Sequence, residues 1–169
     1  MAAFVMVSTF IGIPIPIAGG SNTMIHLGNI TCLLSGMLLG PLYGGLAAAI
    51  GSATFDILNP LYISSAPFTF IFKFIMVFIC GKIAYSNGKN ADDPIYNMLG
   101  ASVGSIIYIL LRFIKSLVIK VYFLGMETET ALILSLNDVM ISVIKTVFVI
   151  IAIVILVPLL KEKLRIKKL

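Results

Sequence analysis

The chain has 169 residues, of which 60% are hydrophobic and only 11% are charged. A water-soluble domain carries about 25% charged residues, so the composition excludes a soluble globular protein and indicates an integral membrane protein. The net charge of +5 does not indicate a nucleic-acid-binding protein, because the basic residues are dispersed apart from one cluster at the C-terminal end.

Six apolar segments follow one another along the chain, and each is a candidate membrane span. A helix needs about 20 apolar residues to cross the hydrocarbon core, so the first three segments are short and need tilt or cover from their neighbours. Breaks at Gly40 and Pro41 and at Asn59 and Pro60 separate the second, third and fourth segments. We expect one all-α domain of six transmembrane helices, near residues 1–13, 26–39, 42–58, 68–85, 94–123 and 131–160.

The stretch 13–29, IPIPIAGGSNTMIHLGN, interrupts the apolar pattern with two prolines, two glycines, small polar residues and the chain's one histidine. Irregular backbone at membrane depth is tolerated only where protein buries it or a cavity hydrates it. We therefore interpret this stretch as the lid of a binding pocket. Asn22 and His26 are its candidate ligand contacts, and capping of the second span is the alternative role of His26.

Small residues recur at four-residue spacing within residues 28–40 and 44–52. Lipid provides no hydrophobic drive for helix association, so small residues let membrane helices approach closely. They predict either tight packing within the chain or a surface that docks onto another membrane subunit. The candidate docking residues are Ala2, Ala3, Gly36, Gly40, Gly44 and Ala48.

Lysine and arginine in the connections predict the orientation. The basic tail 161–169 and the turn between the fourth and fifth spans, with Lys82 and Lys89, fall on one face. We expect this face, and hence the C-terminus, to be cytoplasmic in a multi-pass protein of the bacterial cell membrane. The other connections are then outside, including GMETET, which carries Glu127 and Glu129 and no base.

Ionisable residues also lie inside the spans, where each costs about 2.5–3.5 kcal/mol on insertion. Helical periodicity places the polar residues of the last three spans on stripes weighted to the middle and the outer half. If these stripes converge, they line a polar cavity open to the outside. The stripes consist of Thr69 and Lys73, of Ser105, Tyr108, Arg112 and Ser116, and of Asp138, Ser142 and Lys145.

The basic excess in this region favours an anionic or acceptor-rich ligand. Mutual pairing is the alternative, because pairing is how charges usually persist in membranes. Asp138 could pair with Arg112 or Lys115, and Asp56 with Lys73. Near the outer boundary, Lys120 could simply extend its ammonium group toward water.

Enzyme signatures are missing from the sequence: it has no HExxH, GxSxG or phosphate-binding loop, and no spacing of histidine and cysteine that would hold a metal. Active transport would therefore need an engine on another chain, and we expect no cofactor. Two other classes stay open. A stand-alone channel or secondary carrier would need a continuous polar path, and a membrane-embedded enzyme would use Asp92 and Asp93, which otherwise cap the fifth span.

Two stretches carry a family resemblance: IHLGNITCLLSGMLLGPLYGGLAAAIGSATFDIL, residues 25–58, and APFTFIFKFIMVFICGKIA, residues 66–84. A loop ending in HLG, a Gly-Pro break, a Gly/Ala-rich helix ending in Asp and a P-x-T-x-x-x-K helix follow in order. The pattern resembles the substrate-binding S components of energy-coupling-factor (ECF) vitamin transporters. Spans five and six match this family mainly in length and topology.

The resemblance implies a six-helix protein with an outward-facing vitamin pocket under the outer loops and helices four to six. It implies docking of helices one to three onto a transmembrane scaffold subunit driven by two cytoplasmic ATPases. The S component would topple in the membrane as it joins the scaffold, and ATP hydrolysis would drive release of the vitamin inside. The family's Ala-x-x-x-Ala docking motif is incomplete here, where only Ala2 and Ala3 are present.

The chain resembles most the branch of this family that is assigned to pyridoxine-type or hydroxymethylpyrimidine-type vitamins. Riboflavin is the alternative. The chain has no tryptophan, so a flat ring would stack on tyrosine or phenylalanine, such as Phe68. The candidate substrate-binding residues are Asn22, His26, Tyr62, Thr69, Lys73, Tyr108, Arg112, Asp138 and Ser142.

Overall fold

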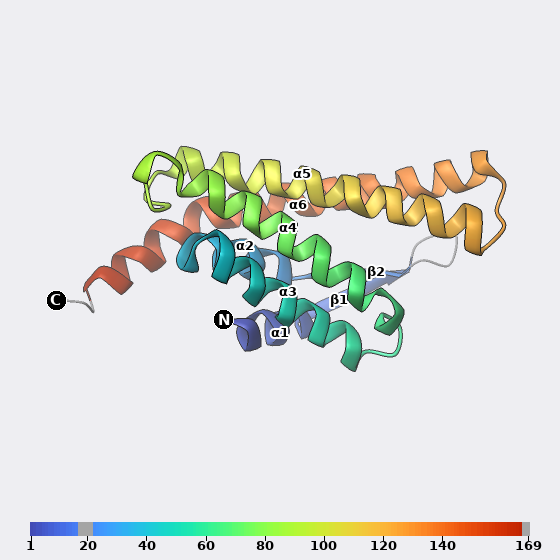
Figure 1. The fold of residues 1–169 in the computed structure, drawn as a ribbon, viewed down its shortest axis with the longest axis horizontal. Coiled ribbons are helices and arrows are strands. Elements are labelled where there is room, and N and C mark those ends of the chain that lie inside the picture. The colour runs from blue at the N-terminus through green and yellow to red at the C-terminus, as the bar shows by residue number, and fades with distance from the viewer. Residues whose placement is uncertain (17–21, 167–169) are drawn as a thin grey trace.

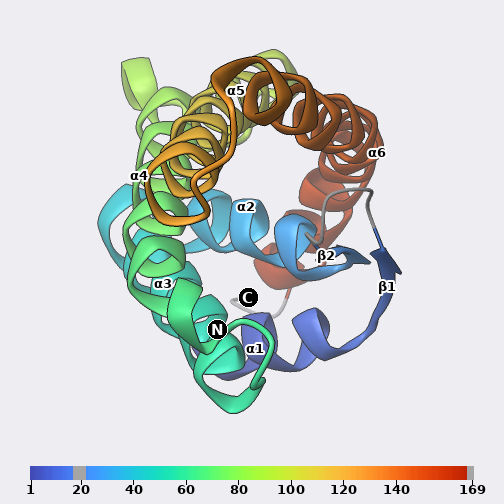
Figure 2. The ribbon, with the colours of Figure 1, turned by 90° about the vertical axis from the view of Figure 1, so that its right-hand side faces the viewer.

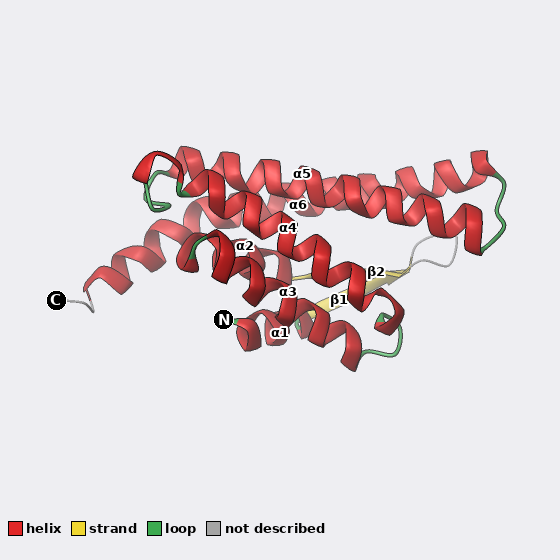
Figure 3. Ribbon diagram, viewed as in Figure 1, coloured by secondary structure: helices red, strands yellow, loops and turns green. Residues whose placement is uncertain are grey.

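The computed structural model describes residues 1–16 and 22–166, with the side chains of 1–12 and 27–163. Six α-helices and one β-hairpin make up the described chain (Figures 1 and 3). The helices are α1 Ala2–Phe10, α2 Gly28–Leu39, α3 Pro41–Leu58, α4 Ala66–Ala84, α5 Pro94–Val118 and α6 Thr128–Ile166. A π-helical segment, Ile119–Phe123, continues α5, and the hairpin strands are β1 Gly12–Pro16 and β2 Asn22–His26.

The long helices have the length and composition of membrane spans. Three segments could cross a bilayer by these criteria, namely Ile63–Ala84, Pro94–Phe123 and Thr128–Lys163, and Gly28–Leu39 is a shorter apolar helix. Large apolar side chains such as Phe148 and Ile106 are exposed along them. Such apolar surfaces suit contact with lipid. The prediction of an all-α membrane protein is confirmed, with the hairpin as an addition.

α2 lies at the centre of the bundle. It packs against α1 and α3 on one side and against α4 and α6 on the other, as the end-on view shows (Figure 2). The hairpin, the α3–α4 connection and the α5–α6 connection gather at one end of the bundle, which we call the hairpin end (Figure 1). The α4–α5 turn and the C-terminus lie at the other end, the tail end.

The first helix is shorter than the predicted span 1–13, because it ends at Phe10 and the chain enters β1 two residues later. β1 pairs with β2 in antiparallel register, Gly12 opposite His26 and Pro16 opposite Asn22. Proline lacks an amide hydrogen and is confined to edge strands, a condition that a two-stranded hairpin meets. The prediction of an irregular loop is therefore wrong for residues 13–16 and 22–26.

Glycines in α2 and α3 allow their backbones to meet. A Cβ on Gly44 would lie 2.4 Å from the carbonyl oxygen of Ser35, and one on Gly36 would lie 2.7 Å from a methyl group of Val77. Ala48 is fully buried. The small-residue ladder thus serves packing within the chain, which was one of its two expected roles, and the docking role of Gly36, Gly44 and Ala48 stays a prediction.

Two predicted docking residues lie in the first helix, and a third lies at the break between α2 and α3. Gly40 is buried and has a positive φ of 81°, which suits glycine and lets α3 begin at Pro41. Ala2 packs through its backbone on Gly51 of α3, since a Cβ there would lie 2.4 Å from the Ala2 oxygen. Ala3 is exposed.

Polar contacts hold the turn at the tail end. Asp93 is the N-cap of α5 and accepts a hydrogen bond from the backbone N–H of Ile95 at 2.9 Å. Lys89 forms an ion pair with Asp93 at 2.5 Å, and Lys161 of α6 pairs with Asp92 at 3.2 Å. The capping interpretation of this acidic pair is confirmed for Asp93.

Candidate functional site

Polar side chains from five helices meet in the interior toward the hairpin end. We call this group the central cluster. It surrounds the Lys73 ammonium group, which is the most deeply buried cation of the described chain, with 2% of the residue exposed. The central cluster consists of Asn29 of α2, Asp56 of α3, Lys73 of α4, Tyr108 and Arg112 of α5, and Lys145 of α6.

The surroundings of Lys73 explain how its charge is accommodated. Its Nζ donates a hydrogen bond to Oδ1 of Asn29 and lies 4.4 Å from the centroid of the Tyr108 ring. A cation within about 6 Å of an aromatic face is attracted by the ring quadrupole. The predicted stripes on α4 and α5 therefore do converge, through Lys73 and Tyr108.

Arg112 is the second cation near the same ring. Its guanidinium carbon is 6.0 Å from the Tyr108 centroid, and Asp56, Lys115 and Lys145 are within its electrostatic reach. Among the described residues it forms no ion pair and no side-chain hydrogen bond. A guanidinium carries five N–H donors, so this group retains donor capacity for a ligand.

Asp56 closes the cluster from α3. Its carboxylate is buried, with 8% of the residue exposed, and it lies against Thr69 and within electrostatic reach of Lys73. Burial of the phenol raises the pKa of Tyr62, and the nearby Asp56 carboxylate raises it further. The Tyr62 hydroxyl is buried and has no hydrogen-bond partner among the described residues. A buried unsatisfied hydroxyl is uncommon in folded proteins and requires an explanation.

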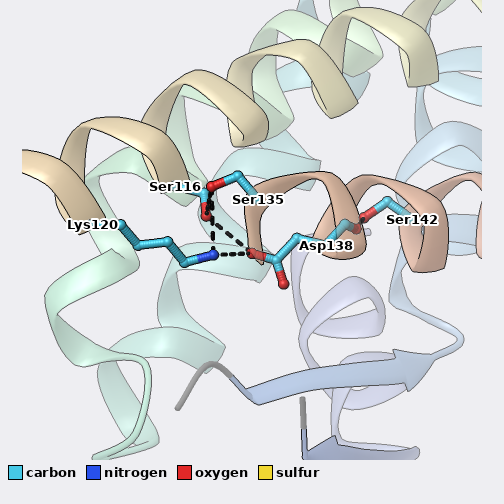
Figure 4. A network of polar contacts seen from close by, with 5 residues as sticks. All are labelled: Ser116, Lys120, Ser135, Asp138 and Ser142. Atoms are coloured by element: carbon cyan, nitrogen blue, oxygen red, sulfur yellow. Dashed lines mark hydrogen bonds and ion pairs between the residues drawn. The ribbon is translucent and has the colours of Figure 1, made fainter. Parts of the chain in front are cut away.

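A second polar group joins α5 to α6, and we call it the α5–α6 network (Figure 4). Nζ of Lys120 lies 3.0 Å from Oδ2 of Asp138 and 3.5 Å from the Ser135 hydroxyl. Ser116 donates to the same Asp138 oxygen at 3.0 Å. The structure pairs Asp138 with Lys120, so the predicted exposure of Lys120 at the boundary is wrong.

Lys120 lies four residues after Ser116 and therefore on the same face of the helix, at the start of the π-helical segment. Lys120 is 5% exposed. Ser142 donates to the backbone oxygen of Asp138 at 2.7 Å, and its contact with substrate stays a prediction.

Lys115 links α5 to the α3–α4 connection. Its Nζ donates to the Ser65 hydroxyl at 2.9 Å and lies 4.7 Å from the centroid of the Phe68 ring. This contact places a further cation and an aromatic ring next to the central cluster, on the side of the hairpin end.

The lid residues are described in part. Asn22 and His26 begin and end β2, and their side chains lie outside the described residues. Sequence reasoning missed Asn29 and Ser135. Asn29 is a polar residue at the start of an apolar helix, which is a signal that could have found it. No group of three or more His, Cys, Asp or Glu residues able to hold a metal occurs in the described part of the chain.

Comparisons with known proteins identify the family of this chain. A family model described as "ECF-type riboflavin transporter, S component" matches residues 1–162. A curated relative is an uncharacterized protein in a gap 3′ region of Pyrococcus woesei, 33% identical over 108 residues, which is 64% of this chain and 67% of that protein. No solved structure matches the chain.

Proposed function

The chain belongs to the family of S components of ECF-type riboflavin transporters, and we propose that it binds its vitamin at the central cluster for ATP-driven import. S components are vitamin-binding transporter subunits rather than enzymes. The family description favours riboflavin, which was the sequence-based alternative, over the pyridoxine-type or hydroxymethylpyrimidine-type vitamin that we expected first. We therefore place a flavin-like heteroaromatic vitamin first among the ligands.

The observation that carries this proposal is the Tyr108 ring with two cations near it. A half-buried tyrosine provides a stacking surface for a flat ring, and Lys73 and Arg112 near the ring provide hydrogen-bond donors for ring oxygens. Pockets that recognise small molecules combine an aromatic surface with a few converging polar groups. The Tyr62 hydroxyl supplies one more such group.

The half of the bundle toward the tail end favours a binding subunit over a channel. The core there is apolar and includes Met76 and Cys80 of α4 and Ile153 and Val157 of α6. A packed apolar core of this kind opposes a continuous path for a polar solute. Movement of the vitamin across the membrane then needs partner subunits, for which we propose a transmembrane scaffold and two ATPases.

The exposed surface of α1 and α3 is the proposed docking site for that scaffold. Ala3 is exposed beside large apolar side chains such as Phe4, Val7, Leu46 and Ile50. Ala2 supports the surface through its packing on Gly51.

Equilibrium titration of the purified full-length chain in detergent tests the binding proposal. Quenching of flavin fluorescence reports riboflavin directly, and pyridoxine and hydroxymethylpyrimidine are tested as competitors. We expect riboflavin to bind with a Kd of about 1 μM or below and Tyr108→Leu to weaken binding. Tyr43→Leu is the matched control, because Tyr43 is 72% exposed on α3. If none of the three vitamins binds the wild-type protein, the proposal is wrong.

A further inference from the structure

Cations outnumber carboxylates in the interior of the hairpin end. Five basic residues, Lys73, Arg112, Lys115, Lys120 and Lys145, gather there with two acidic ones, Asp56 and Asp138. Lys120 already pairs with Asp138 at 3.0 Å. A charge excess in a membrane interior is costly unless something compensates it.

No further carboxylate of the chain is placed to compensate these cations. Its other five acidic residues lie elsewhere, and the stretch 13–26 holds none. Asp92 and Asp93 are in the turn at the tail end, where both pair with lysines. Glu127 and Glu129 are exposed at the start of α6, and Glu162 is exposed near its end. An anion bound from outside the chain would therefore lower the cost of burying these cations.

Two groups in the cluster have donor capacity for such an anion. Lys73 and Lys115 donate to Asn29 and Ser65, whereas Arg112 donates to no described residue. The planar guanidinium matches the geometry of a carboxylate or a phosphate, to which it donates two parallel hydrogen bonds. The Tyr62 hydroxyl, within electrostatic reach of Arg112, is buried without a partner.

We infer that the preferred ligand carries an anionic group, a phosphate monoester or a carboxylate, which Arg112 and Tyr62 bind beside the heteroaromatic ring. This inference rests on the proposed function and narrows it, since it separates the phosphorylated form of the vitamin from the neutral form. Lys145 and Lys115 add to the local positive potential, which concentrates anions at the site.

Matched ligand pairs on the wild-type protein test the inference without any substitution. Riboflavin is compared with riboflavin 5′-phosphate, and pyridoxine with pyridoxine 5′-phosphate, in neutral-lipid nanodiscs. We expect the phosphorylated member to bind at least about tenfold more tightly, as a charge-assisted bidentate contact provides. Equal or tighter binding of the neutral member overturns the inference and leaves the proposed function standing.

The variant Arg112→Gln tests whether Arg112 binds the anionic group of the ligand. We expect it to weaken binding of the phosphorylated form by at least about tenfold more than binding of the neutral form, so that the preference is lost. Arg112→Lys is expected to retain part of the preference, and Lys89→Gln at the tail end is the control for loss of one positive charge. A preference that persists in Arg112→Gln overturns the assignment. A preference that anionic lipid removes in wild-type nanodiscs overturns it too, because the cations would then bind lipid headgroups.

Discussion

The Lys73 ammonium group lies 4.4 Å from the centre of the Tyr108 ring, with 2% of the lysine exposed. The contact joins α4 to α5 in the interior of the bundle. Asn29 of α2 accepts the hydrogen bond of the same ammonium group, so one charge fixes three helices relative to one another. This arrangement makes Lys73 both a structural residue and a candidate binding residue, and the two roles can be separated.

Lys73→Met is expected to weaken vitamin binding and to lower the free energy of unfolding. The unfolding effect arises because the half-buried Asn29 loses its donor, which costs about 1 kcal/mol. The double variant Lys73→Met/Asn29→Leu removes both polar partners, so we expect its stability to recover and its binding to stay weak. Denaturant unfolding in detergent and ligand titration measure the two quantities. Recovery of binding in the double variant would contradict a binding role for Lys73.

Gly44→Val is expected to destabilise the protein or to prevent its folding. The added Cβ would meet the Ser35 oxygen at 2.4 Å and the Gly36 Cα at 2.5 Å, and overpacking of a well-packed interior typically costs about 1–3 kcal/mol or more. The midpoint of thermal unfolding in detergent measures the effect. Val103→Ile enlarges an exposed side chain of α5 and serves as the control. A Gly44→Val protein with the thermal midpoint of the wild type would mean that α2 and α3 are farther apart.

Local patterns in the sequence predict the helices and much of the cluster. The break at Gly40 and Pro41 and the cap at Asp93 are signals that the backbone itself requires, and they hold in the structure. The convergence of Lys73 with Tyr108 follows from helical periodicity together with the need to hide charge from lipid. Such reasoning needs only the residues of one helix at a time.

The features that sequence reasoning missed depend on contacts between segments. The hairpin requires β1 to pair with β2 across residues 17–21, and its prolines resemble those of an irregular loop. The direction of Lys120 follows the stripe of Ser116, but its partner Asp138 lies on another helix, which no pattern within α5 identifies. Asn29 acquires its role only because α2 approaches α4.

Acid is expected to destabilise the turn at the tail end through Asp93. The hydrogen bond from Lys89 holds the pKa of Asp93 below its ordinary value of 3.8. This stabilisation is therefore fully present above that value and is lost as the pH falls through the lowered pKa. Asn is also a good N-cap, so Asp93→Asn should keep the cap and lose the pH dependence. Thermal midpoints between about pH 6 and pH 2 measure the difference.

The control for this titration is Glu129→Gln, at an exposed carboxylate in the first turn of α6. Its thermal midpoint should follow the pH dependence of the wild type over the same range. Parallel curves for the wild type and Asp93→Asn would show that the Lys89 contact does not stabilise the folded state.

Breaking the Lys120–Asp138 ion pair is expected to cost more than breaking any exposed pair. The side chains are only 6% and 15% exposed, so Lys120→Met removes the ion-pair partner of a mostly buried carboxylate, and we expect a loss of up to about 3–5 kcal/mol of unfolding free energy. Lys120→Met/Asp138→Leu removes both charges and should recover most of that loss, because two apolar side chains can replace a buried pair. Lys89→Met breaks a pair whose side chains are 33% and 29% exposed and should change stability far less. Equal effects of Lys120→Met and Lys89→Met on denaturant unfolding would mean that water reaches Asp138 and that the α5–α6 network is open to solvent.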